Sequence, residues 1–318
     1  MKRTFNIRIF LIILFILLLS IDAYAFWMWT PETNKWVNPK YAVKDTPQEQ
    51  LEYSLEFYKV KEYEDASREL KKLLKHYPRA RQAPEAQYYL GMVFEGQSKP
   101  YLAFKEYQMV IDKYPFSDLS SEIIKKQYDL GIALLEGEFA HGAFFNVFAD
   151  DHDVIDIFRA VIKNAPYGDL ASTSQYKIGL YLQEKGLYQE SRDEFEKVIN
   201  DYPDSEWAKA AKYQIAKSDA ERSAAAPYDQ KITQAAVEGF EDFLKDNPDA
   251  ELSKDAKEKI GQLREKEAEN SFITANFYAK QSNYKAAKIY YRVVIDEYPD
   301  SKWAKEALKK IQEVGEKE

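Results

Sequence analysis

The residues of this chain that could do chemistry are few, and most of them lie in one short stretch. Asp150, Asp151, His152 and Asp153 are consecutive, and His141 lies nearby. Carboxylates and imidazoles are common ligands of divalent metals. Four adjacent residues cannot all turn toward one ion on a helix, and the stretch lacks the glycine and the spaced oxygens of a calcium loop. We therefore expect a solvated acidic turn that caps a helix starting at Val154, with no metal site, and keep a metal-binding or enzymatic role as the alternative.

Catalytic motifs are absent elsewhere in the sequence. The chain has no Gly-x-Ser-x-Gly, no phosphate-binding glycine-rich loop and no His-Glu-x-x-His. It has three histidines and no cysteine, which excludes disulfides, thiolate metal sites and cysteine nucleophiles. We expect a protein that is not an enzyme and that uses no cofactor.

Composition narrows the class of partner. The formal net charge is −8, so the chain offers no basic stripe that would displace counterions from a nucleic acid. Hydrophobic residues make up 45% of the chain, and 24 tyrosines and 18 phenylalanines supply large rings for packing. We expect a folded chain whose partners are proteins and not nucleic acids.

Residues 1–25 read as a targeting segment. Lys2, Arg3 and Arg8 precede the apolar run Ile9–Leu19, and a small-x-small site ends at Ala25. This order is typical of a secretory signal peptide, and we expect cleavage after Ala25. The alternative is an uncleaved membrane anchor, but the apolar run is shorter than the roughly 20 residues that span a bilayer. Export without cysteine suits the oxidising periplasm.

A repeated sequence pattern predicts the helices that would position any functional site. Asp201–Ala211 (DYPDSEWAKAA) and Glu297–Ala307 (EYPDSKWAKEA) are nearly identical. A proline that closes one helix before the next begins is typical of a helical solenoid, in which helix pairs stack to bury their apolar faces. Such prolines recur at Pro78, Pro115, Pro166, Pro203, Pro248 and Pro299.

The small residues have a fixed phase relative to these prolines. Gly91 precedes Pro115 by 24 residues, and Gly179 precedes Pro203 by the same number. This pattern resembles the tetratricopeptide repeat. We predict an all-α, right-handed superhelix of about six helix pairs over residues 46–318, with a last helix from Trp303 to about Val314. Alanines are expected where the two helices of a pair cross, at Ala66, Ala103 and Ala287.

Two segments carry a closer resemblance. The last unit reads FYAKQSNYKAAKIYYRVVIDEYPDSKWAKEAL, and the third unit contains the insertion GEFAHGAFFNVFADDHDVIDIFRAVIKNAPYG. From about Thr46 onward the chain resembles the outer-membrane protein assembly factor BamD and its relatives. The resemblance implies a non-catalytic interaction scaffold of the bacterial envelope that acts in outer-membrane protein assembly. Its implied partners are an outer-membrane assembly component or unfolded outer-membrane clients.

The chain departs from that family at one point. Family members are lipoproteins, tethered by a lipidated cysteine directly after the signal peptide, where this chain has Phe26. We expect a periplasmic protein, peripheral to the outer membrane and associated with the membrane only through its partners. An alternative is a periplasmic adaptor that coordinates envelope growth or cell division. That alternative ranks lower, because such proteins carry an oligomerising N-terminal coiled coil, which is absent here.

A row of rings is the first candidate binding surface. Tyr88, Tyr128 and Tyr176 each stand three residues before a phase glycine, and Tyr213 and Phe272 stand three before an alanine. In a tetratricopeptide repeat this position faces the concave groove, where rings and phenolic hydroxyls would suit a peptide. The alternative is that these rings pack one helix against its neighbour.

Residues 26–45 form the second candidate, which we call the aromatic arm. Trp27, Trp29 and Trp36 lie in this short span on either side of Pro31. We expect a hairpin or an extended arm with Pro31 at a turn. The arm either docks on a partner or on the membrane interface, or folds back and caps the first repeat.

Overall fold

The computed structural model describes residues 27–30, 35–38, 42–137, 151–225, 230–249 and 251–316. The predicted signal peptide, the predicted turn at Pro31, and residues 138–150 of the insertion in the third unit lie outside these ranges.

The described residues are almost wholly helical, which confirms the predicted all-α tetratricopeptide fold. A two-stranded hairpin, β1 (Met28–Thr30) and β2 (Lys35–Val37), precedes the helices. In chain order the helices are α2 (Pro47–Lys59), α3 (Tyr63–His76), α4 (Ala83–Gly96), α5 (Pro100–Lys113), α6 (Ser120–Leu135), α7 (Asp151–Asn164), α8 (Asp169–Glu184), α9 (Tyr188–Asp201), α10 (Glu206–Ala225), α11 (Gln230–Asp246), α12 (Ser253–Lys280), α13 (Tyr284–Glu297) and α14 (Lys302–Gly315). Their order matches the six helix pairs and the last helix that the proline spacing predicted, and the two helices pack on each other in the pairs α2–α3, α6–α7, α8–α9, α10–α11 and α12–α13.

The six recurring prolines end the second helix of each pair. Each lies two residues beyond the last helical residue of α3, α5, α7, α9, α11 or α13. Proline lacks the backbone N–H that a helix needs, and it disfavours helical geometry in the residue before it. In four pairs the residue before the proline is a C-cap tyrosine whose backbone N–H still reaches the carbonyl four residues earlier: Tyr77, Tyr114, Tyr202 and Tyr298.

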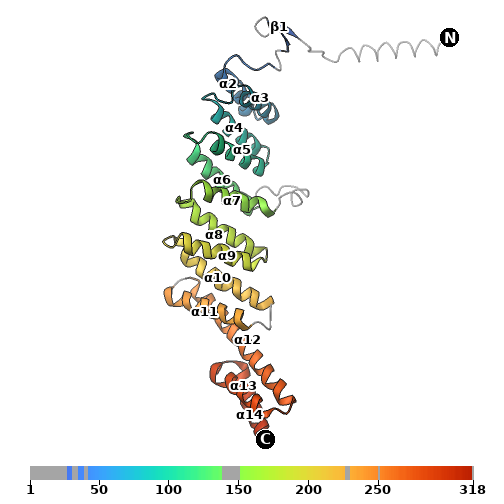
Figure 1. Cartoon of the computed structure of the whole chain (residues 1–318), viewed down its shortest axis with the longest axis vertical. Helices are drawn as coiled ribbons and strands as arrows, with labels where there is room; N and C mark the ends of the chain where they lie inside the picture. Colours follow the sequence, from blue (N-terminus) through green and yellow to red (C-terminus); the bar gives the residue numbers. More distant parts are fainter. Residues whose placement is uncertain are drawn as a thin grey trace, which may run out of the picture. The chain divides into compact units, whose positions relative to one another are not determined.

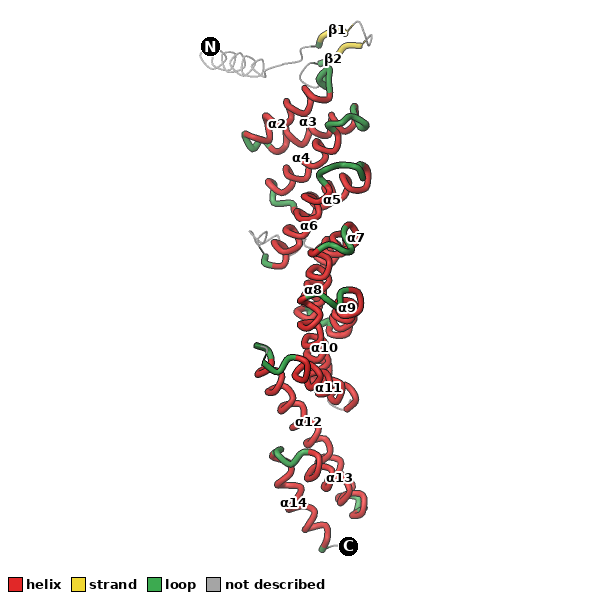
Figure 2. Tube along the Cα trace, turned by 90° about the vertical axis from the view of Figure 1, so that its left-hand side faces the viewer, coloured by secondary structure: helices red, strands yellow, loops and turns green. Residues whose placement is uncertain are grey.

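The chain divides into two compact units, one ending at Gln97 and the other beginning at Ser98. In the first unit, α2, α3 and α4 pack on one another in order. In the second unit each helix from α5 to α14 packs on the next, so neighbours in sequence are neighbours in space (Figures 1 and 2). Helices α4 and α5, which the sequence predicts as one pair, belong to different units.

Small residues sit where two helices approach closely. Ala66, Ala103 and Ala287 are fully buried, as expected for crossing positions. A β-carbon added at Gly179 would come within 2.5 Å of the Phe195 ring, so the ring of α9 lies directly over the backbone of α8. The phase glycine is therefore a consequence of the ring on the opposing helix.

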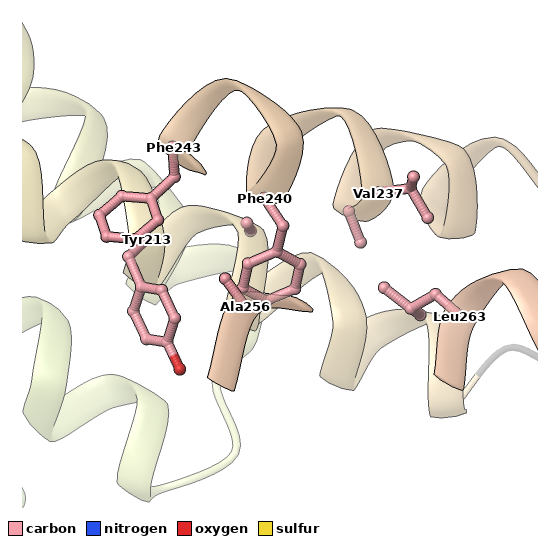
Figure 3. Close-up of a cluster of buried hydrophobic side chains, with 8 residues drawn as sticks. Tyr213, Val237, Phe240, Phe243, Ala256 and Leu263 are labelled. Atoms are coloured by element: carbon pink, nitrogen blue, oxygen red, sulfur yellow. The ribbon is translucent and has the colours of Figure 1, made fainter. Parts of the chain in front are cut away.

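One long helix carries two successive cores. The start of α12 contributes Ala256 and Leu263 to a cluster with Tyr213, Phe240 and Phe243 from α10 and α11 (Figure 3). The end of the same helix contributes a different set to a second cluster with α13 and α14: Ala268, Phe272 and Ala275. Helix α12 runs without a break from Ser253 to Lys280, so a single helix contributes to both clusters.

The two near-identical stretches begin their helices differently. The Ser301 hydroxyl accepts a hydrogen bond from the backbone N–H of Ala304 at 3.2 Å and so acts as the N-cap of α14. The Ser205 hydroxyl, at the matching place before α10, donates to the carbonyl of Tyr202 at 2.8 Å.

Candidate protein-binding surfaces

The row of rings predicted from the sequence lies mostly inside the helix layers. Tyr88, Tyr176, Tyr213 and Phe272 are buried, and Tyr128 is half-buried. Little of their surface is therefore open to a partner in this conformation. Their role in binding a client stays a prediction, while their role in packing is visible.

The clearest packing is around Tyr176 on α8. Its ring stacks on the indole of Trp207 at a centroid distance of 4.8 Å and lies 5.3 Å from the ring of Phe195. The Trp207 Nε1–H donates to the Thr173 hydroxyl at 2.8 Å. Trp207 belongs to α10 and Phe195 to α9, so one tyrosine joins three consecutive helices.

The same arrangement recurs in the last unit. Phe272 on α12 lies 5.0 Å from the indole of Trp303 and 5.7 Å from the ring of Tyr291. Here the buried Nε1–H of Trp303 has no hydrogen-bond partner. Trp207 and Trp303 hold the same place in the two near-identical stretches, so the sequence repeat is a repeat of this ring stack.

The phenol groups link one unit to the next. The Tyr176 hydroxyl accepts from Gln214 Nε2 at 3.2 Å, and the Tyr213 hydroxyl donates to the Asp255 carboxylate. Burial, followed by this hydrogen bond to a carboxylate, raises the pKa of Tyr213 well above its ordinary value. These contacts run from α8 to α10 and from α10 to α12, so the hydroxyls fix the stacking of consecutive first helices.

A buried polar motif of the repeats was missed by sequence reasoning. Gln50 on α2 donates to the Glu69 carbonyl and to its Oε2, both at 3.1 Å, and Lys72 pairs with the same carboxylate at 2.8 Å. On α8 and α9, Gln175 donates to Glu194, and Lys197 pairs with Glu194 at 2.8 Å. Each glutamine precedes its glutamate by 19 residues, and this repeated spacing could have been recognised in the sequence.

Exposed apolar side chains gather on the first helix of the last unit. Ile273 and Phe277 on α12 are 55% and 56% exposed, and they lie one turn apart on one helix face. In the repeat phase Phe277 holds the place of Val93 and Ser218, which are both buried. Sequence reasoning missed these two residues because it followed the neighbouring ring position, Phe272.

The aromatic arm is a hairpin, one of the two forms predicted for it. Trp29 of β1 pairs with Trp36 of β2, with ring centroids 5.7 Å apart in an edge-to-face arrangement. Trp27, Trp29 and Trp36 are 55%, 43% and 62% exposed. The indoles thus remain open to solvent and do not themselves form a buried cap over the first repeat.

The root of the arm is fixed to the first unit. The backbone N–H of Lys44 donates to Gln50 Oε1 at 2.8 Å, and the Tyr77 hydroxyl donates to the Lys44 carbonyl at 2.7 Å. The Lys44 ammonium lies 4.0 Å from the centre of the Tyr53 ring. The hairpin therefore leaves the helices from a held point.

The acidic stretch of the third unit is only partly within the described ranges. His141 and Asp150 lie outside them, and for Asp151, His152 and Asp153 only the backbone is described, in the first turn of α7. Helix α7 thus begins before Val154, where the sequence predicted its start. Within the described part of the chain, no group of three or more metal-ligating side chains comes together.

The helices of the described ranges include none that is long and apolar enough to cross a membrane. This finding covers only those ranges.

Comparison with protein families identifies three segments. Residues 216–317 match the model of the YfiO family, described as outer membrane lipoprotein. Residues 54–118 and 173–205 match two tetratricopeptide-repeat models. The chain therefore carries tetratricopeptide repeats, and its last third, from the middle of α10 through α14, is YfiO-like. Among curated proteins, none matches the chain.

Several solved structures are similar to this chain. The C-terminal part of a TPR repeat-containing protein from Cytophaga hutchinsonii is 14% identical, with a TM-score of 0.35 over 83% of this chain and 88% of that chain. YrrB, a TPR protein with an unusual peptide-binding site, is 16% identical, with a TM-score of 0.34 over 69% of this chain and 94% of that chain. MamA from Desulfovibrio magneticus RS-1 is 16% identical, with a TM-score of 0.31 over 66% of this chain and 100% of that chain.

Proposed function

We propose that this chain is a non-catalytic protein–protein interaction scaffold of the bacterial cell envelope that acts in outer-membrane protein assembly. The observation that carries the proposal is the YfiO-like segment, residues 216–317, built on tetratricopeptide helix pairs. Its partner is an outer-membrane assembly component or an unfolded outer-membrane client. The place of action is the periplasm, after cleavage of the leader behind Ala25.

The binding surface of this scaffold is the exposed face of α12. Solenoid proteins present an extended surface because each unit buries apolar area only against its neighbours. Ile273 and Phe277 leave more than half of their side-chain surface open, within the YfiO-like segment. On the same helix, Phe272 is packed against Trp303 and Tyr291, so α12 is held in place and loses little freedom on binding.

Affinity capture tests this proposal directly. The tagged chain is expressed in its own organism, cross-linked in the cell and captured from the membranes, and its partners are identified by mass spectrometry. We expect an outer-membrane assembly protein among the partners of the parent chain. Ile273→Ser with Phe277→Ser should reduce that partner by about tenfold or more, since two exposed apolar anchors are lost.

The matched control changes an exposed apolar residue on a second helix. Ile289 on α13 is 62% exposed, and Ile289→Ser should leave capture unchanged. A parent chain that captures only cytoplasmic proteins, or no envelope protein at all, would overturn the proposal. Equal losses in the double variant and in the control would remove the binding role from α12.

The row of rings needs a different variant, because four of its five members are buried and Tyr128 is half-buried. Serine at Tyr88, Tyr128 and Tyr176 would leave cavities, and each large-to-small change costs about 3–5 kcal/mol of stability. Tyr176→Phe removes only the hydroxyl that accepts from Gln214. If the row binds clients through its hydroxyls, this variant should lose capture while its helices stay folded.

The proposed export is tested by intact mass. Chain recovered from a periplasmic extract should begin at Phe26 and carry no acyl group. Full-length chain confined to the inner-membrane fraction would show that residues 1–25 act as an anchor.

A further inference from the structure

We propose that one face of the hairpin, formed by Trp27, Trp29 and Trp36, inserts into the interfacial layer of a lipid bilayer and holds the chain at the membrane surface. We call this surface the tryptophan face. The inference rests on the proposed envelope location. It departs from the expectation that partners alone bring the chain to the membrane.

The register of the hairpin puts the three indoles together. Trp29 pairs directly with Trp36, and Met28 pairs with Val37. Trp27 stands immediately before β1 and two residues before Trp29, so the alternation of side chains along an extended chain assigns it to the face of Trp29. Paired residues share a face, so Trp36 joins them. A shift of one residue in the pairing would have sent Trp36 to the opposite face.

The tryptophan face is open and broad. Its three indoles are each about half exposed, and the paired rings of Trp29 and Trp36 lie 5.7 Å apart. Together they present on the order of a few hundred Å² of aromatic surface, which is the size of the largest apolar patch on a typical monomer, and such patches are often functional. An indole has an apolar body and one N–H donor, and it therefore prefers the level of the lipid headgroups.

The edges of the hairpin are poorly suited to pairing with another protein. Both β1 and β2 are three residues long. A strand added to either edge would form only a few backbone hydrogen bonds, which are the source of affinity in strand addition. The recognition therefore comes from the face and its exposed rings, which need no strand of a partner and can enter a bilayer interface directly.

The charge of the aromatic arm favours a membrane as the binding partner of the tryptophan face. Residues 26–45 contain Lys35, Lys40 and Lys44 against Glu32 and Asp45, a net of +1, whereas the whole chain is −8. Anionic lipids attract a positive segment and repel an acidic one. The aromatic arm therefore carries a small positive charge within an acidic chain, and it can approach an anionic surface without a net charge penalty.

The held root makes the arm useful as a tether. Lys44 is bound by Gln50 and Tyr77, as described above, and six residues separate it from Val37 at the end of β2. Binding of the hairpin would therefore place the first unit within roughly 25 Å of the surface. The YfiO family is described as outer membrane lipoprotein, and this chain has no cysteine to carry a lipid. The tryptophan face would supply the attachment that a lipid provides in such proteins.

Vesicle flotation tests the inference without any protein partner. The chain recovered from a periplasmic extract is mixed with vesicles of phosphatidylethanolamine containing a minority of phosphatidylglycerol. We expect the parent chain to float with the vesicles, and its tryptophan fluorescence to be quenched when the lipid tails carry bromine. The variant W27S/W29S/W36S should lose binding by about a hundredfold, since three half-exposed rings leave the interface.

The matched control removes two aromatic rings that are fully exposed elsewhere. Phe116 and Tyr167 lie in the connections after α5 and α7, and F116S/Y167S should float like the parent. All variants should keep the helical circular dichroism of the parent, because the three indoles are about half exposed and precede the helices.

Two results would overturn the inference. One is a parent chain that does not float, and the other is a triple tryptophan variant that floats as well as the parent. A triple variant that loses a protein partner, with no vesicle binding by either chain, would identify the face as a protein-docking surface instead. A chain that captures envelope partners but never binds vesicles would leave the proposed function standing and refute this inference alone.

Discussion

The close approach of α8 and α9 makes a prediction in which one substitution has opposite effects at two sites. Gly179 and Gly261 both lie inside helices. A β-carbon at Gly179 would meet the Phe195 ring at 2.5 and 2.7 Å, whereas a β-carbon at Gly261 would meet nothing within 4 Å. We expect Gly179→Ala to destabilise the chain and Gly261→Ala to stabilise it.

The magnitudes follow from two effects. Alanine is favoured over glycine in a helix interior by about 1 kcal/mol, and this gain applies at both sites. At Gly179 the Phe195 ring must move, but it is fully buried against Tyr176, and the Ser191 hydroxyl also holds the Gly179 carbonyl at 2.8 Å. Overpacking of this kind costs about 1–3 kcal/mol. The difference between the two variants should equal the overpacking effect, because the helix preference cancels.

Urea unfolding followed by circular dichroism gives the two midpoints. Solenoids can unfold unit by unit, so amide hydrogen exchange of α8 should be measured alongside the midpoint. We expect faster exchange in α8 for Gly179→Ala and no change there for Gly261→Ala. If both variants are stabilised equally, the crossing of α8 and α9 is not as the structure has it, and the repeat phase fails with it.

Two further predictions concern the stability of variants in the tryptophan ring contacts and in the last repeat unit. Trp207→Phe should reduce the free energy of unfolding by about 1 kcal/mol more than Trp303→Phe does. The reason is that the indole N–H of Trp207 donates to Thr173, whereas that of Trp303 has no partner. Thermal unfolding of both variants measures the difference, and equal losses of stability would contradict the prediction. Burial raises the pKa of Glu267, with repulsion from nearby carboxylates adding to it, so its stabilising contribution is fully present below the ordinary pKa of 4.5 and is lost as pH rises through the folded pKa. The Glu267→Gln variant should therefore gain stability relative to the parent as pH rises from below 4.5 to above the folded pKa of Glu267, as measured by urea midpoints across pH. A stability difference that does not change with pH would show that the carboxyl titrates alike in the folded and unfolded states.

The proline and small-residue pattern allowed the fold to be predicted in detail. Proline cannot continue a helix, so the six prolines located the ends of six helices without knowledge of any contact. Gly179 and Ala287 located crossings, because only small residues leave room for a second helix. These constraints act within one helix or between two neighbouring helices, and they recur at a fixed spacing. A single sequence was therefore enough to predict them.

The candidate binding surfaces could be predicted from the sequence only in part. The ring at Tyr176 is the same residue type whether it faces a groove or a neighbouring helix, and only the stack with Trp207 decides that it is buried. Phe277 is apolar at a position where two earlier units are buried, so nothing in its identity showed that it is exposed.

The sequence by itself determined the class of fold, the number of helix pairs, and the presence of an aromatic arm. Each of these depends on backbone preference and on spacing along the chain. The tertiary structure decided which faces are covered, because coverage depends on the neighbouring helix and not on the residue. It also decided that Trp29 and Trp36 share one face, because the strand register sets which side chains point the same way.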